Sequence, residues 1–148
     1  MSSLRRATIA DLSAVVALQR AAYAKNRPLL GVEPLPLLAD YQQIFAGYEV
    51  YLAERDGALE GVLILELRDD DLLIWSIAVA PPAQGRGVGN RMLAFAEARA
   101  HELKRTCIRL YTGQPLTQNI AWYTRHGYAH ESTEHMGDRV RVNLIKHL

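Results

Sequence analysis

Residues 72–89, LLIWSIAVAPPAQGRGVG, restrict the possible folds of this chain more than any other stretch. An apolar run over 72–79 is typical of a buried strand, three glycines (Gly85, Gly87 and Gly89) are typical of a turn, and a helical pattern begins directly after them. The first N–H groups of a helix have no partner within the helix and lie at the positive end of its dipole. The stretch therefore predicts an anion-binding turn, with a purely structural strand-to-helix connection as the alternative.

The spacing of the glycines excludes two common phosphate-binding motifs. A dinucleotide fingerprint counted from Gly85 and Gly87 requires a third glycine at position 90, where the chain has Asn90. A Walker-type loop requires Gly-Lys followed by Ser or Thr, a run that the sequence does not contain. A nucleotide-dependent oxidoreductase is therefore disfavoured, and the remaining pattern is Q-x-x-G-x-G at Gln84, Gly87 and Gly89.

Composition and charge narrow the class of protein. The 148 residues, 49% of them hydrophobic, predict a single domain over 1–148, and the net charge of +1 argues against a nucleic-acid or membrane-surface partner. A single cysteine, Cys107, excludes an internal disulfide and is expected in the core. No apolar run approaches the roughly 18 residues that a membrane span requires, so we expect a cytoplasmic protein.

The first third of the chain is predicted to be mostly helical. A short strand over 4–7 is followed by an amphipathic helix over 8–24. Three prolines lie within 25–36, so this segment is expected to be a loop, before a short helix over 37–46. A loop of about a dozen residues exceeds the usual length of a connection, which favours a functional role over a simple connector.

From residue 48 onwards the pattern changes to that of an antiparallel meander. Three strands are predicted over 48–54, 59–67 and 72–80, separated by Asp56-Gly57 and by an acidic turn at 69–71. The three adjacent carboxylates of this turn are expected to be solvated rather than to hold a metal ion. The glycine turn thus follows the last strand of a meander, whereas a Rossmann domain places it after its first parallel strand.

The last part of the chain alternates helices and strands. The pattern predicts, in order, a helix over 88–103, a strand over 106–112, a helix over 117–126 ended by Gly127, and a hairpin of strands over 128–134 and 139–146. We therefore predict an α/β fold of the α+β type, with a central, mostly antiparallel mixed sheet of six to seven strands flanked by about four helices.

Two motifs together resemble a known family. The Q-x-x-G-x-G pattern after the Ile-Ala-Val step at 77–79 resembles the pyrophosphate-binding signature of the GNAT superfamily of N-acetyltransferases. Tyr123, followed four residues later by Gly127 and then Tyr128, resembles the last motif of that family. Each motif is weak by itself, but their order and the helix and strand between them make the resemblance specific.

The resemblance implies a function and a set of site residues. It implies acetyl-CoA as co-substrate, no metal, and transfer of the acetyl group to a primary amine by direct attack, with Tyr123 as the general acid and the Val79 N–H as oxyanion donor. The CoA-binding residues that it implies are Ile77, Ala78, Val79, Gln84, Gly85, Arg86, Gly87, Val88, Gly89 and Asn90. Many family members form dimers, so a homodimer is an open alternative to a monomer.

Two departures from the family pattern leave roles open. The family's usual Asn stands seven residues before the tyrosine, where this chain has Leu116; Asn119, one helical turn before Tyr123, is a candidate substitute for CoA binding. Some members carry a glutamate base where this chain has Tyr111. Because of these departures, a non-catalytic acyl-CoA-binding or regulatory module of the same fold is the alternative to an enzyme.

The sequence identifies neither the general base nor the acceptor. Candidates for the base are Glu66, Asp40, Tyr111, a water held near Ser76, and His135. The acceptor is a small-molecule or peptide amine, which we expect to bind against the proline-containing segment, with Tyr23, Tyr41 and Arg27 as candidate contacts.

Overall fold

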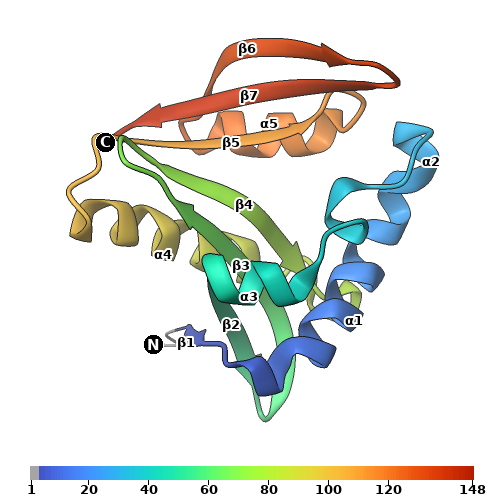
Figure 1. Ribbon diagram of the computed structural model, residues 1–148, viewed down its shortest axis with the longest axis vertical. Coiled ribbons are helices and arrows are strands. Elements are labelled where there is room, and N and C mark those ends of the chain that lie inside the picture. The colour runs from blue at the N-terminus through green and yellow to red at the C-terminus, as the bar shows by residue number, and fades with distance from the viewer. Residues whose placement is uncertain (1–3) are drawn as a thin grey trace.

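The computed structural model describes residues 4–148 and contains a seven-stranded sheet with helices on both faces (Figure 1). The strands are β1 (Arg5–Arg6), β2 (Glu49–Arg55), β3 (Ala58–Leu67), β4 (Leu72–Val79), β5 (Cys107–Gly113), β6 (Ala129–Met136) and β7 (Arg139–His147). They lie in the order β1-β2-β3-β4-β5-β7-β6, and every neighbouring pair is antiparallel except β4 with β5. The predicted fold class, an α/β protein with a mostly antiparallel mixed sheet, is confirmed.

The helices divide between the two faces of the sheet. The α-helices are α1 (Leu12–Tyr23), α2 (Arg27–Leu30), α3 (Tyr41–Gly47), α4 (Val88–Glu102) and α5 (Thr117–Arg125), and short 3-10 turns lie at η1 (Ile9–Asp11), η2 (Ala24–Asn26), η3 (Leu35–Leu37) and η4 (Pro81–Ala83). One apolar cluster joins α1 and α3 to the sheet, and a second joins α4 and α5 to its other face. Cys107 is 7% exposed in the structure, which confirms its predicted place in the core. Within residues 4–148, no helix combines the length and apolar character needed to cross a membrane.

The turns of the meander and hairpin follow from local chemistry. Asp56 and Gly57 both adopt positive φ angles (52° and 79°), the conformation that suits a tight hairpin between β2 and β3. Gly127 has a φ of 94° and donates its N–H to the Thr124 carbonyl at 3.1 Å, which ends α5 where the sequence predicted. The predicted meander, its tight turn and the C-terminal hairpin are confirmed.

The segment between α1 and β2 is more regular than predicted. Residues 27–30 form the single helical turn of α2 within the expected loop, and the second helix begins at Tyr41 rather than at residue 37. Asp40 causes this shift because its carboxylate accepts the N–H groups of Gln42 (3.0 Å) and Gln43 (3.4 Å) as an N-cap.

The acidic turn at 69–71 contains one buried carboxylate, which corrects the prediction that all three are solvated. Asp69 and Asp70 are exposed, but Asp71 is only 3% exposed. Its carboxylate accepts hydrogen bonds from Arg68 (2.7 and 2.6 Å) and from Arg109 on β5 (2.8 Å). The pairing with Arg109 connects the β3–β4 turn to the parallel neighbour of β4.

We expect Asp71→Asn to destabilise the fold by about 3 kcal/mol at pH 7, because it leaves two guanidinium groups without their buried partner. Hydrogen bonds from Arg68, then Arg109, lower the pKa of Asp71, so its contribution is present above the ordinary pKa and is lost as the pH falls through the folded-state value. Urea unfolding at pH 7 and at about pH 3 measures this, and the difference between wild type and variant should shrink at the lower pH. Asp70→Asn, at an exposed position, is the matched control and should leave the midpoint unchanged; equal midpoints for the two variants would contradict the assignment.

Candidate active site

The site begins where β4 and β5 separate. Their parallel pairing comprises three residue pairs and ends at Ile74 and Leu110. At the same point the ladder between β3 and β4 skips Trp75, because Leu65 pairs with Ile74 and Ile64 with Ser76. Such an extra residue is a β-bulge, which bends the strand that contains it. The rest of β4 and the end of β5 therefore leave a gap in the middle of the sheet.

Backbone donors of β4 face this gap. Ala80 donates its N–H to the Glu60 carbonyl at 2.8 Å, which makes these two residues a hydrogen-bonded pair of the antiparallel ladder. Because such pairs alternate along a ladder, the N–H groups of Val79 and Ile77 point away from β3, toward the side that β5 has left. The Val79 carbonyl on that side accepts a hydrogen bond from Gln84 Nε2 at 3.2 Å.

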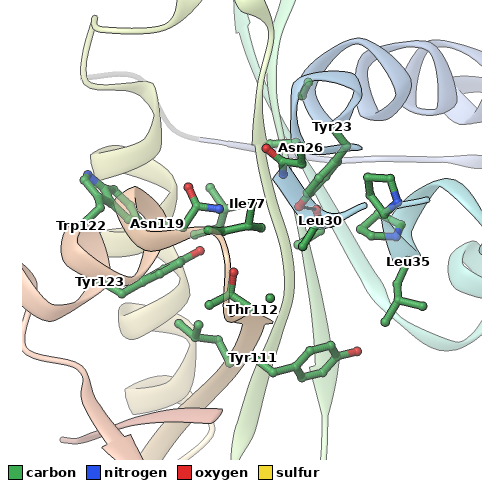
Figure 2. A pocket seen from close by; sticks show the side chains of 18 of the residues that line it. Tyr23, Asn26, Leu30, Leu35, Ile77, Tyr111, Thr112, Asn119, Trp122 and Tyr123 are labelled. Atoms are coloured by element: carbon green, nitrogen blue, oxygen red, sulfur yellow. Dashed lines mark hydrogen bonds between the residues drawn. The ribbon is translucent and has the colours of Figure 1, made fainter. Parts of the chain in front are cut away.

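A cavity of about 660 Å³ occupies the gap and contains most of the predicted site residues (Figure 2). Those in its lining are Ile77, Ala78, Val79, Gln84, Gly85, Gly87, Val88, Gly89, Asn90, Asn119 and Tyr123. Arg86 is not part of the lining; its side chain is 56% exposed and lies 3.9 Å from a carboxylate oxygen of Glu60. The remaining walls come from the end of α1, from α2 and η3, and from β5 and β7.

The glycine turn has the geometry of an anion-binding loop. Gly85 and Gly87 have φ angles of 81° and 79°, which other residues adopt only with strain, and Gly87 is the N-cap of α4. The first hydrogen bond of α4 runs from the Arg91 N–H to the Gly87 carbonyl (3.1 Å), so the preceding N–H groups of the first turn have no acceptor within the helix. This end of the cavity therefore offers backbone donors at the positive end of a helix dipole.

Glu60 lies beside the glycine turn and was not found by sequence reasoning. It is 5% exposed, and its carboxylate oxygens lie 3.7 Å from Arg55, 3.9 Å from Arg86 and 3.7 Å from Arg91. The isolated glutamate in strand β3 gave no sequence signal, because its cationic neighbours come from the end of β2, the glycine turn and the first turn of α4. Glu60 concentrates guanidinium groups next to the turn.

Helix α5 presents two predicted residues to the cavity. Asn119 and Tyr123 lie one turn apart, and Figure 2 shows both side chains pointing toward Ile77. The Tyr123 ring packs edge-on against Trp122 (centroids 4.9 Å apart) and Tyr128 (5.7 Å). Burial raises the pKa of Tyr123 above its ordinary value, so the phenol is protonated at neutral pH. Leu116, at the place of the family's usual asparagine, is buried and also borders the cavity.

A buried polar network supports the opposite wall. The hydroxyl groups of Tyr23 and Ser76 lie 2.7 Å apart, and Gln19 Nε2 donates to Ser76 Oγ (3.1 Å) and to the Tyr41 hydroxyl (3.0 Å). Tyr41 in turn donates to the Pro36 carbonyl at 2.7 Å, which connects α1, β4 and α3 to the proline-containing segment. Burial raises the pKa of Tyr23 to about 12, so this hydroxyl also stays protonated at neutral pH.

The candidates for the general base differ in their positions. Tyr111 and Ser76 line the cavity, whereas Glu66 and His135 are not part of its lining. Asp40 serves as the N-cap of α3 and lies outside the cavity. Among residues 4–148 there is no group of three or more His, Cys, Asp or Glu side chains arranged to hold a metal ion.

Comparison with known proteins identifies the family. Residues 46–130, more than half of the chain, match the family model described as an acetyltransferase (GNAT) domain. The chain belongs to the GNAT acetyltransferase family. The matched region includes both the glycine turn and the Tyr123 helix, the two segments that meet at the cavity of this GNAT protein.

Solved structures share the fold over the whole length of the chain. The PaiA N-acetyltransferase of Thermoplasma acidophilum in complex with coenzyme A superimposes with a TM-score of 0.85 at 15% identity, covering 100% of this chain and 99% of that one. A ribosomal-protein-alanine N-acetyltransferase from Brucella melitensis has a TM-score of 0.76 at 24% identity, covering 99% of each chain. A GNAT acetyltransferase from Elizabethkingia anophelis with acetyl-CoA bound has a TM-score of 0.71 at 18% identity, covering 99% of this chain and 97% of that one.

We expect Gln19→Leu to destabilise the protein by about 2 kcal/mol, because it removes a buried partner from the hydroxyl groups of Ser76 and Tyr41. Urea unfolding followed by circular dichroism measures the change. Gln118→Leu, at an exposed position in the first turn of α5, is the control and should leave the midpoint close to that of wild type. A Gln19→Leu midpoint equal to that of the control would show that the network adds no stability.

Proposed function

We propose that this GNAT protein transfers the acetyl group of acetyl-CoA to a primary amine, which attacks the thioester directly. One observation carries the proposal: the gap between β4 and β5 brings unpaired backbone N–H groups of β4 and the Tyr123 hydroxyl to the same cavity. Membership of the family, and related folds solved with coenzyme A or acetyl-CoA bound, support the choice of donor.

The proposed donor site follows the lining of the cavity. The pyrophosphate binds to the N–H groups of the turn from Gln84 to Asn90, and the pantetheine arm follows Ile77, Ala78 and Val79. Asn119 is positioned to contact the arm from α5. Arg86 lies outside the cavity lining near Glu60, so we assign it a contribution to the positive potential beside the turn and no contact inside the cavity.

The proposed reaction requires attack by the amine, stabilisation of the oxyanion and protonation of the leaving thiolate. The amine nitrogen forms a bond to the carbonyl carbon, and the negative charge that develops on the carbonyl oxygen is stabilised by the Val79 N–H. The carbon–sulfur bond then breaks, and the departing thiolate takes a proton from Tyr123. The acylated nitrogen gives up one proton as it becomes an amide, and this proton restores the Tyr123 phenol. The raised pKa of Tyr123 keeps this proton in place at neutral pH, although it makes the phenol a weaker acid than free tyrosine.

The attacking amine must lose a proton because alkyl amines are mostly charged at neutral pH. Of the base candidates from the sequence, Tyr111 and Ser76, the residue proposed to hold a water, belong to the cavity wall. Burial raises the pKa of Tyr111, so its phenol is protonated at neutral pH and is no base. We therefore assign the role to a water held beside Ser76, because a base must lie within hydrogen-bonding reach of the amine or one water away from it.

Binding and turnover test different parts of the proposal. Isothermal titration with acetyl-CoA, desulpho-CoA and NADH should show binding of the two CoA compounds alone. Thiol release with a panel of amines then distinguishes an enzyme from a non-catalytic acyl-CoA-binding module. No binding of either CoA compound would overturn the donor assignment, and binding without thiol release would favour the module.

We expect Gly87→Glu to weaken acetyl-CoA binding by about 100-fold or more, because it places a negative charge where the pyrophosphate is proposed to lie. Gly57→Glu is a matched control: Gly57 has the same φ of 79° and the same open surroundings, but it lies in the β2–β3 turn away from the cavity. Titration calorimetry should show loss of affinity in the first variant only. A similar loss in both would point to backbone strain, and unchanged affinity in both would exclude the turn as the pyrophosphate site.

We expect Tyr123→Phe to lower kcat by about 100-fold while the Kd for acetyl-CoA stays within about twofold of wild type, because only the proton donor is removed. Thiol release at saturating substrate measures kcat. Tyr48→Phe, a partly buried tyrosine outside the cavity, is the control and should retain the wild-type rate. A Tyr123→Phe enzyme with unchanged kcat would exclude the phenol as general acid.

A further inference from the structure

The cavity lining carries more positive than negative side chains. Within residues 4–148, the lining contains three cations, Lys25, Arg139 and Arg141, and one acid, Asp138. Lys25 donates to Gln84 Oε1 at 3.4 Å and so belongs to the glycine-turn end. The two arginines of β7 belong to the wall formed with the end of β5, where Gly113 pairs with Arg141. This wall is therefore electropositive, although no phosphate is proposed to lie there.

Arg139 has a structural partner in the segment that covers the cavity. It donates to the Glu33 carbonyl at 2.6 Å, while the Glu33 carboxylate lies 3.4 Å from Arg27. Arg139 thus attaches the α2–η3 segment to β7. The charge of Arg139 adds to the positive potential of the wall, but part of its donor capacity is already used.

Arg141 retains donor capacity toward the cavity. One terminal nitrogen donates to Glu134 Oε1 at 2.8 Å, and that partly exposed oxygen also accepts from Asn143 at 2.7 Å. The guanidinium carbon lies 4.5 Å from the centre of the Tyr111 ring, a cation–π contact that holds the group beside the cavity wall. Arg141 Nε is buried and has no hydrogen-bond partner among the described residues. A buried donor without an acceptor is costly, so a small shift of the side chain that brings Nε onto an oxygen of a bound molecule would relieve this cost.

Apolar and aromatic side chains line the same cavity as Arg141. Tyr111, Trp75, Leu30 and Leu35 line the same cavity, and Figure 2 shows Leu30 and Leu35 across from the strands on the α2–η3 side. These side chains suit an apolar body rather than a chain of charged amines. A polyamine would also require several acids, whereas Asp138 is the one acid among the described residues of the lining.

We propose that the acceptor is a small primary amine that also carries a carboxylate, of the class of free amino acids with apolar side chains. Arg141 binds this carboxylate. The inference depends on the proposed acetyl transfer. The guanidinium fork matches a carboxylate geometrically, and its stacking on Tyr111 orients it in advance. The apolar side chain of the acceptor then lies against Trp75, Leu30 and Leu35. Arg141 is the specificity-determining residue of this arrangement.

Pairs of amines that differ in the carboxylate test, with the wild-type protein, whether the acceptor requires this group. Thiol release from acetyl-CoA is measured with L-phenylalanine, L-phenylalanine amide and phenethylamine, with the corresponding leucine series, and with spermidine. We expect kcat/KM for the two amino acids to exceed that for the amides, the decarboxylated amines and spermidine by about tenfold or more. Equal or better turnover of the amides, the simple amines or spermidine overturns the inference and leaves the proposed transfer intact. Release with none of the acceptors, or no binding of acetyl-CoA, counts against the proposed function itself.

Substitution of Arg141 tests whether this residue binds the carboxylate of the acceptor. In Arg141→Gln we expect KM for the amino acids to rise about tenfold or more, KM for the amides to stay within about twofold, and the Kd for acetyl-CoA to stay unchanged. Arg141→Lys keeps the charge but loses the fork, and should give an intermediate KM. Arg20→Gln, at an exposed position on α1 outside the cavity, is the matched control. An unchanged KM for the amino acids in folded Arg141→Gln or Arg141→Lys protein overturns the assignment of Arg141.

Discussion

The short parallel pairing of β4 with β5 is the constraint on which the site depends. Parallel strands that continued side by side would satisfy each other's backbone groups and close the sheet. Here the pairing stops after Ile74, where the bulge at Trp75 bends β4. Beyond the bulge, the N–H groups of Ile77 and Val79 face a cavity instead of a neighbouring strand. The same event thus creates the space for a ligand and the donors that can bind it.

Buried polar groups hold both sides of this opening. On one side, Gln19 and Ser76 connect α1 to β4 and, through Tyr41, to the segment that covers the cavity. On the other side, Glu60 holds arginines beside the glycine turn. Asp71 and Arg109 tie β4 to β5 just before the strands separate. A gap in a sheet would otherwise be a weak point, and these contacts restrain its edges.

The parts of the fold that the sequence predicted correctly are those that depend on neighbours along the chain. The meander, the Asp56-Gly57 turn and the end of α5 at Gly127 follow from local periodicity and glycine conformation. The sequence-based prediction failed where the position of a side chain depends on a residue far away in the chain. Asp71 was expected in solvent because its partner Arg109 lies 38 residues away. The position of Arg86, whose role in CoA binding stays a prediction, also depends on a distant residue, because its side chain lies outside the cavity lining near Glu60.

The sequence by itself determined the order of the elements, the glycine turn at the start of α4 and the family, because these depend on local spacing and on two motifs. Only the tertiary structure decided which residues share a cavity. It brought Arg141 and Tyr111 from neighbouring strands together with Leu30 from α2. It also buried the carboxylate of Glu60 beside the glycine turn. Periodicity along a chain reports which face of an element is buried, but the charge and shape of a cavity arise from segments that meet only after folding.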